Sequence, residues 1–130
     1  MVSEFLVNRG IKNYLVEIGG ELSSKGVNNN GDYWKIGIEK PVDSSLIGQF
    51  GFQRIVELKN KSLATSGNYR KFKIINGEKV SHSINPNTGF PVNNSLLSVT
   101  VICKMAANAD ALATSFMAVS YTHLTLPTKA

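Results

Sequence analysis

The dipeptide Asn76-Gly77 constrains the fold of this chain more than any other feature. It lies between two strand-like runs of about seven residues, and such an Asn-Gly pair is the strongest short signal for a tight β-hairpin. A two-residue turn at this point would pair Lys71 with His82 across the hairpin. The chain therefore has to accommodate antiparallel β-structure in its second half.

The rest of the chain reads as further strands with a helix near each end. Side-chain periodicity predicts helices over residues 1–9 and 105–119, and strands over residues 14–18, 34–38, 50–58 and 96–103. We expect the first two of these strands to pair as a hairpin. The strand at 96–103 is apolar on both faces, which predicts a central position. This element order indicates an α+β fold, mostly antiparallel sheet with flanking helices.

Composition limits the class of protein. The 130 residues suffice for about one domain, with 42% hydrophobic and 18% charged residues. The single cysteine, Cys103, excludes an internal disulfide within the chain. The net charge of +5 favours anionic ligands. The lysines are scattered singly without interleaved aromatics, so we expect no nucleic-acid partner.

Two short glycine-containing segments could approach a ligand closely. Gly19 and Gly20 interrupt the first strand, which fits either a simple bulge or a close backbone approach to a ligand. The turn Thr65-Ser66-Gly67 fits either a plain turn or a phosphate-binding set of N–H groups. The pattern alone leaves both alternatives open.

Asp110 and Thr114 introduce oxygen atoms into an apolar run. On a helix they lie at i and i+4 on one face, among Ala, Leu, Phe and Met. A carboxylate buried there would need a partner, and a hard divalent cation such as Mg²⁺ is one. The alternative is that Asp110 caps the helix and Thr114 bonds back to the preceding turn.

His82 is the only histidine outside the last eleven residues. We place it on a strand, where it is either a satisfied core residue or a general base or phosphate contact. The turn residues that follow it, including Pro86 and Thr88, would expose backbone N–H groups nearby.

Five segments in this order and spacing resemble the FAD:protein FMN transferases of the ApbE family. They read LVEIGGEL, WKIGIEKP, SLATSGNYRKF, VSHSINPNTGFPV and ADALATSFMAV. The resemblance covers residues 1–119, and we interpret residues 120–130 as a tail outside the family pattern, with a frame change or an assembly artefact as its source. It further implies that the chain is the C-terminal part of a longer domain, truncated at its N-terminus and weak or inactive alone.

The resemblance implies a specific chemistry. FAD is split at its diphosphate with Mg²⁺, FMN becomes esterified to a threonine hydroxyl of an acceptor protein, and AMP leaves. His82 would assist proton transfer, while Asp110 and Thr114 would be metal ligands. The residues implied to contact FAD are Gly19, Gly20, Glu21, Thr65, Ser66, Gly67, His82, Pro86 and Thr88.

The resemblance implies a bacterial protein that acts in the periplasm or at the outer face of the cytoplasmic membrane. Any membrane anchoring would therefore come from a segment N-terminal to this chain. Asn68 and Asn85 replace aspartates that are commoner in the family, which removes a charge at each position. Two other functions remain open: an FAD diphosphatase that uses water as the nucleophile, and a non-catalytic anion- or nucleotide-binding module.

Overall fold

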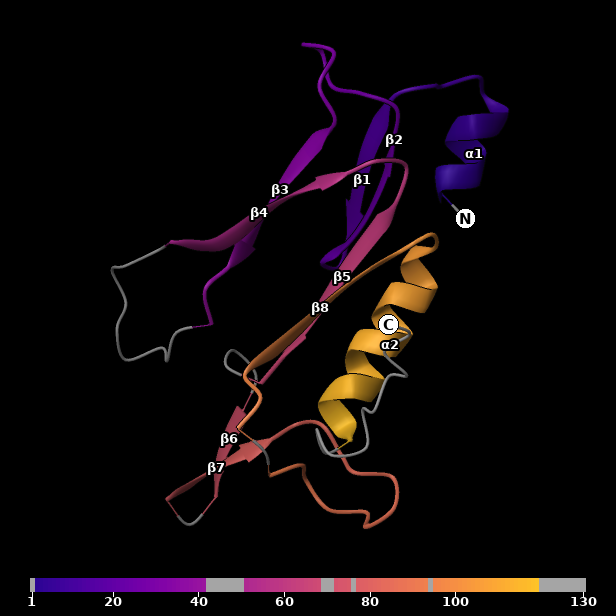
Figure 1. Ribbon diagram of the computed structural model, residues 1–130. Helices are drawn as coiled ribbons and strands as arrows, with labels where there is room; N and C mark the ends of the chain where they lie inside the picture. Colours follow the sequence, from indigo (N-terminus) through magenta and orange to yellow (C-terminus); the bar gives the residue numbers. More distant parts are fainter. Residues whose placement is uncertain (1, 42–50, 69–71, 76, 94, 120–130) are drawn as a thin grey trace, which may run out of the picture.

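The computed structural model describes residues 2–41, 51–68, 72–75, 77–93 and 95–119 (Figure 1). It is an α+β fold, as the element order predicts. The elements are α1 (Val2–Asn8), β1 (Tyr14–Ile18), β2 (Glu21–Lys25), β3 (Trp34–Glu39), β4 (Phe52–Leu58), β5 (Ser62–Gly67), β6 (Phe72–Ile75), β7 (Glu78–Ser81), β8 (Ser98–Cys103) and α2 (Ala106–Ala118). In the part of the chain that is described, no helix has the length and apolarity needed to cross a bilayer.

A four-stranded antiparallel sheet in the order β1-β2-β5-β8 forms the body of the molecule. The predicted central position of the strand at 96–103 is wrong: β8 lies at one end of this sheet, beside β5 only among the described strands. The apolar residues on the two faces of β8 have different surroundings, and only one face is covered. One face packs under α2 while Ile102, on the other, remains 39% exposed.

Helix α2 packs against the sheet through small residues (Figure 1). Its buried side chains are Ala109, Ala113 and Met117, spaced four residues apart on one face. The alanines let the helix approach β5 closely. An apolar stripe through Leu112, Phe116 and Val119, which the sequence of this helix also suggests, is wrong at Leu112, whose side chain is 42% exposed.

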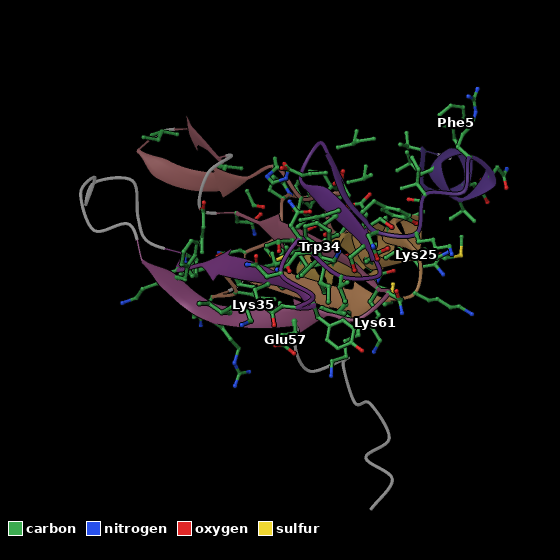
Figure 2. The ribbon with its side chains drawn as sticks, turned by 90° about the horizontal axis from the view of Figure 1, so that it is seen from above. Phe5, Lys25, Trp34, Lys35, Glu57 and Lys61 are labelled. Carbon is green, nitrogen blue, oxygen red and sulfur yellow. The ribbon has the colours of Figure 1, made fainter. Side chains whose placement is uncertain are left out.

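Strands β3 and β4 form a separate two-stranded ribbon beside the main sheet. The predicted hairpin between the first strand and the strand at 34–38 is therefore wrong: β1 pairs with β2, and β3 pairs with β4. The indole N–H of Trp34 donates to the carbonyl of Lys25 at 3.1 Å, which ties the ribbon to the end of β2. Figure 2 shows Lys35 and Glu57 on the outer side of the ribbon.

The predicted hairpin at Asn76-Gly77 is confirmed in its described part. Phe72 pairs with Ser81 and Ile75 with Glu78, which leaves a two-residue connection, and Gly77 has a φ of +81°. Lys71, the expected partner of His82, lies outside the described residues.

The N-terminal helix is also confirmed. It ends before Gly10, whose φ of +77° suits glycine, and the N–H of Ile11 returns to the carbonyl of Leu6 at 3.0 Å. Phe5 is 56% exposed and projects away from the rest of the molecule in Figure 2.

Candidate functional site

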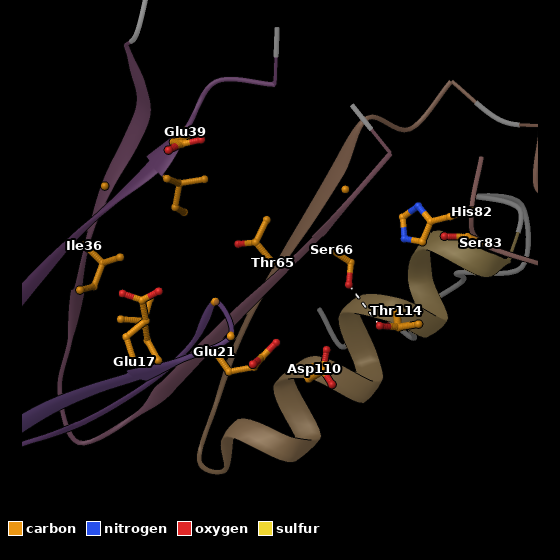
Figure 3. Close-up of a pocket in the computed structure, with 16 residues that line it drawn as sticks. Glu17, Glu21, Ile36, Glu39, Thr65, Ser66, His82, Ser83, Asp110 and Thr114 are labelled. Atoms are coloured by element: carbon orange, nitrogen blue, oxygen red, sulfur yellow. Dashed lines mark hydrogen bonds between the residues drawn. The ribbon is translucent and has the colours of Figure 1, made fainter. Parts of the chain in front are cut away.

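One cavity of about 630 Å³ collects most of the residues singled out in the sequence (Figure 3). Such a volume is typical of ligand sites. Five parts of the chain meet there: the β1–β2 hairpin, β3, the end of β5, the segment after β7, and one face of α2. The lining residues are Glu17, Gly19, Gly20, Glu21, Leu22, Ile36, Gly37, Ile38, Glu39, Thr65, Ser66, Gly67, His82, Ser83, Asp110 and Thr114.

Gly19 and Gly20 form the turn of the β1–β2 hairpin. Their φ values are +68° and +103°, and Ile18 pairs directly with Glu21 across them. The expectation of one strand interrupted by a bulge is therefore wrong. A two-residue turn with both φ angles positive favours glycine at both positions. This tight tip places Glu21 at the cavity wall.

The end of β5 presents an open backbone edge to the cavity. β8 pairs with β5 along its whole length, whereas β2 pairs only with Ser62 and Leu63. Antiparallel strands direct successive residues' backbone groups to opposite sides. The carbonyl of Lys61 accepts from β2, so the backbone groups of Thr65 and Gly67 point to that same side, beyond the reach of β2.

Asp110 and Thr114 lie on the cavity-facing side of α2. Asp110 is exposed to the cavity, so the expected buried carboxylate is wrong: the apolar neighbours Ala109 and Ala113 face the sheet instead. The helix-capping alternative is also wrong for Asp110, because Met105 holds the N-cap position.

Thr114 reaches across to the sheet. Its Oγ1 lies 3.2 Å from Oγ of Ser66, in a hydrogen bond that either hydroxyl can donate (Figure 3). The bond back to the preceding turn is made by its neighbour, Ser115, whose hydroxyl donates to the carbonyl of Ala111 at 2.7 Å. The helix and β5 thus place two hydroxyls side by side, one turn of helix from the carboxylate of Asp110.

His82 is an exposed residue of the cavity wall and not a core residue. It directly follows β7, which ends at Ser81, so its predicted place within a strand is wrong. Figure 3 shows its imidazole on the same side of the cavity as Ser66 and Thr114. The three groups on which the predicted chemistry depends, the imidazole and the Asp110–Thr114 pair, therefore converge.

The cavity is acidic although the chain is basic. Its described lining carries four carboxylates and neither lysine nor arginine, in contrast to the net charge of +5. The carboxylates belong to Glu17, Glu21, Glu39 and Asp110. An anionic ligand therefore meets repulsion here unless a cation accompanies it.

The donor atoms fit a hard divalent cation that keeps part of its water shell. Within the described residues no three His, Cys, Asp or Glu side chains lie close enough to hold a metal alone. Mg²⁺ is commonly bound through one or two carboxylates, with waters and substrate phosphates as the other ligands. The Asp110 carboxylate with the Thr114 hydroxyl meets that requirement.

Two predicted residues do not reach the cavity. Pro86 and Thr88 belong to a turn in which the N–H of Phe90 donates to the hydroxyl of Thr88 at 3.3 Å, and the cavity lining includes neither residue. Their role in binding stays a prediction.

Sequence reasoning missed the contribution of β3 and of Glu17. Ile36, Gly37 and Ile38 line the cavity, and a Cβ on Gly37 would lie within 2.4 Å of the ring of Phe52. A glycine inside a strand is the signal that could have drawn attention to this wall.

Comparison with known proteins identifies the family. The sequence model described as "ApbE family" matches residues 1–125. This chain belongs to the ApbE family. The match passes the predicted boundary at residue 119, and residues 120–130 lie outside the described structure.

Several ApbE relatives carry the name FAD:protein FMN transferase. The Vibrio cholerae protein is 45% identical over 117 residues, and the Escherichia coli K12 protein is 38% identical over 116 residues. These alignments cover 90% and 89% of this chain but 34% and 32% of the relatives. The chain thus spans about a third of the length of the curated relatives it matches.

Solved ApbE structures share the fold. The flavin transferase ApbE from Vibrio cholerae superimposes with a TM-score of 0.73 at 43% identity, covering 90% of this chain and 35% of that one. The apo form of the Pseudomonas stutzeri flavinyl transferase ApbE gives 0.74 at 38% identity, covering 90% and 34%. The predicted α+β flavin-transferase fold is therefore confirmed.

Proposed function

We propose that the cavity binds the diphosphate of FAD together with Mg²⁺ and supports transfer of FMN to a threonine hydroxyl of an acceptor protein, with release of AMP. The observation that carries this proposal is the convergence of His82, Asp110 and Thr114 on one cavity. The names of the relatives, which specify FAD as donor and a protein as acceptor, support the same reading.

The acidic lining supports a role for the cation. A diphosphate placed between Glu21 and Asp110 would be repelled, and a divalent cation on Asp110 and Thr114 would reverse that repulsion. When bound, the cation would offset negative charge that develops on the diphosphate during bond cleavage.

The residues of the chain have separate tasks in this scheme. His82 accepts the proton of the acceptor hydroxyl, whose oxygen bonds to the flavin-side phosphorus. The bond from that phosphorus to the bridging oxygen breaks, and the bridging oxygen leaves with AMP. The open edge of β5 at Thr65 and Gly67 offers backbone N–H groups to phosphate oxygens.

The hairpin tip has a different task. Glu21 lies well apart from His82 on the cavity wall (Figure 3), and we assign Gly19, Gly20 and Glu21 to the adenosine half of FAD. This arrangement would leave the flavin-side phosphorus beside the imidazole.

The partner belongs to the same proposal, whereas the compartment rests on the family resemblance alone. The acceptor is a protein that presents a threonine in an accessible segment. We place the reaction in a bacterial periplasm or at the outer face of the cytoplasmic membrane.

A product analysis tests the proposed function. Because the resemblance implies weak or no activity for the chain alone, it is fused to the N-terminal part of the Vibrio cholerae relative that the alignment leaves uncovered. The fusion is incubated with FAD and Mg²⁺, with and without an acceptor protein that this relative modifies. We expect AMP in solution and flavin fluorescence that stays with the acceptor on a denaturing gel.

Other outcomes would favour the competing functions. AMP and free FMN formed equally well without acceptor would identify a diphosphatase. FAD binding without any AMP, unchanged in Asp110→Asn, would identify a non-catalytic module and contradict the proposal.

A further inference from the structure

The amide of Asn68 anchors both residues that flank His82. Oγ of Ser81 donates to Oδ1 of Asn68 at 2.8 Å, and Oγ of Ser83 donates to the same oxygen at 3.3 Å. The N–H of Ser83 in turn donates to Oγ of Ser81 at 3.0 Å. One side-chain oxygen thus fixes a three-residue segment with His82 at its middle.

Asn68 is itself held in place by the backbone. It directly follows β5, and its N–H donates to the carbonyl of Leu97 at 2.9 Å, ahead of β8. The other end of the segment is also fixed, because the carbonyl of Ser83 accepts from the N–H of Val92 at 2.8 Å. The anchor therefore connects the main sheet to a segment that belongs to no strand at His82.

The position of His82 needs such an anchor. The residue is exposed and directly follows the last residue of β7, so its placement depends on the contacts of its neighbours Ser81 and Ser83 as well as on its own. A general base works only within hydrogen-bond reach of the proton it removes, and small displacements lower the rate strongly.

We infer that Asn68 is a positioning residue for His82, acting through the hydroxyls of Ser81 and Ser83. This inference rests on the proposed function, since it concerns the same imidazole. The feature that matters is an acceptor oxygen at position 68, because both hydroxyls donate to it. An aspartate retains that oxygen, whereas leucine has a similar size and lacks it.

The test measures the side-chain rotamer of His82 by NMR. The chain holds two histidines, so His82→Gln identifies the signals of position 82. Three-bond couplings across χ1 of His82 are compared in the wild type, Asn68→Leu, Asn68→Asp and Asn30→Leu. Asn30 is an exposed loop asparagine outside the cavity lining and serves as the matched control.

We expect one dominant rotamer in the wild type, in Asn68→Asp and in Asn30→Leu, and averaged couplings in Asn68→Leu. Amide shift changes in Asn68→Leu should concentrate around residues 78–84. Should Asn68→Leu fail to fold, the double variant Ser81→Ala and Ser83→Ala removes the donors instead and should show the same averaging. Unchanged couplings in the folded variant that lacks the anchor would overturn the inference.

An activity measurement separates this inference from the proposed function. In the fusion used to test the proposed function, AMP release should fall at least about tenfold in Asn68→Leu and recover in Asn68→Asp, with the KM for FAD unchanged. If His82→Gln keeps full AMP release, the proposed role of the imidazole fails. If His82→Gln is inactive while Asn68→Leu matches the wild type in both measurements, only the positioning role fails.

Discussion

Asp110 is the residue on which the proposed cation binding depends most. It is the only carboxylate that α2 contributes to the cavity, and Thr114 stands one helical turn away on the same face. Thr114 is in turn fixed against β5 by its contact with Ser66 at 3.2 Å. The cation would therefore bind where helix and sheet are already joined.

Replacing Asp110 with asparagine should separate cation binding from folding. Asp110→Asn keeps the size of the side chain but removes the charge, so we expect Mg²⁺-dependent FAD affinity to fall about tenfold or more. Calorimetric titration with FAD, with and without Mg²⁺, measures the effect. Asp32→Asn makes the same chemical change in an exposed loop and should leave the affinity unchanged; equal losses in both variants would argue against a cation on Asp110.

The identity of the functional side chains was the feature of the site that the sequence predicted best. Side chains such as His82, Asp110 and Thr114 stand out because oxygen and imidazole groups are unusual among apolar neighbours. The sequence did not predict whether these side chains are buried or exposed. The apolar neighbours of Asp110 point to the sheet, whereas its carboxylate points to the cavity. The acidic lining was hidden too, since Glu17 and Glu39 are far apart in the chain.

At the scale of elements, the tip of the β1–β2 hairpin shapes one wall of the cavity. Its turn requires positive φ at Gly19 and Gly20, and a Cβ at Gly20 would meet no other atom within 4 Å. The glycine is therefore needed for its backbone conformation and not for lack of space.

The variant Gly20→Ala should accordingly lower the free energy of unfolding by about 1–2 kcal/mol. Gly51→Ala is the matched control, because a Cβ there also meets nothing and its φ lies outside the left-handed region. Chemical denaturation of both variants measures the difference. Equal stabilities would show that the turn adopts another conformation in solution.

The ribbon β3–β4 holds a tight contact between Gly37 and Phe52. A Cβ on Gly37 would come within 2.4 Å of the ring, so Gly37→Ala should displace Phe52 and destabilise the ribbon. In a Phe52→Ala background the same change should cost little. A double-mutant cycle measures this coupling, which we expect at about 0.5–3 kcal/mol; strictly additive effects would contradict the contact.

Local elements were predictable, whereas their partners were not. The hairpin at Asn76-Gly77 and helix α2 are encoded by neighbouring residues, and both are present. The pairing of β3 with β4 joins strands separated by a long connection, and no local signal specifies it. The place of β8 at one end of the described sheet likewise depends on the whole topology.

At the scale of the whole molecule, the core of the described residues is confined to β5, α2 and the last residue of β4. The buried apolar side chains among the described residues are Leu58, Leu63, Ala64, Ala109, Ala113 and Met117. Many large apolar side chains elsewhere are exposed, including Phe52 at 68% and Phe90 at 72%. Stability should therefore be distributed unevenly across the fold.

Hydrogen exchange should follow this distribution. We expect the slowest amide exchange in β5, which pairs on both sides and packs under α2, and much faster exchange in the isolated β6–β7 hairpin. Mass spectrometry of peptic fragments measures both regions in one experiment. Similar protection in β5 and β6–β7 would mean that the core extends further than the buried residues indicate.

The most direct test of the account is to locate the cation and the nucleotide together. Mn²⁺ replaces Mg²⁺ in the presence of FAD, and paramagnetic broadening is followed in amide NMR spectra. We predict that amides at Gly67, His82, Asp110 and Thr114 lose intensity first, while those of β4 and α1 persist. Broadening centred on any other part of the chain, with these four signals intact, would contradict a shared FAD and cation site in this cavity.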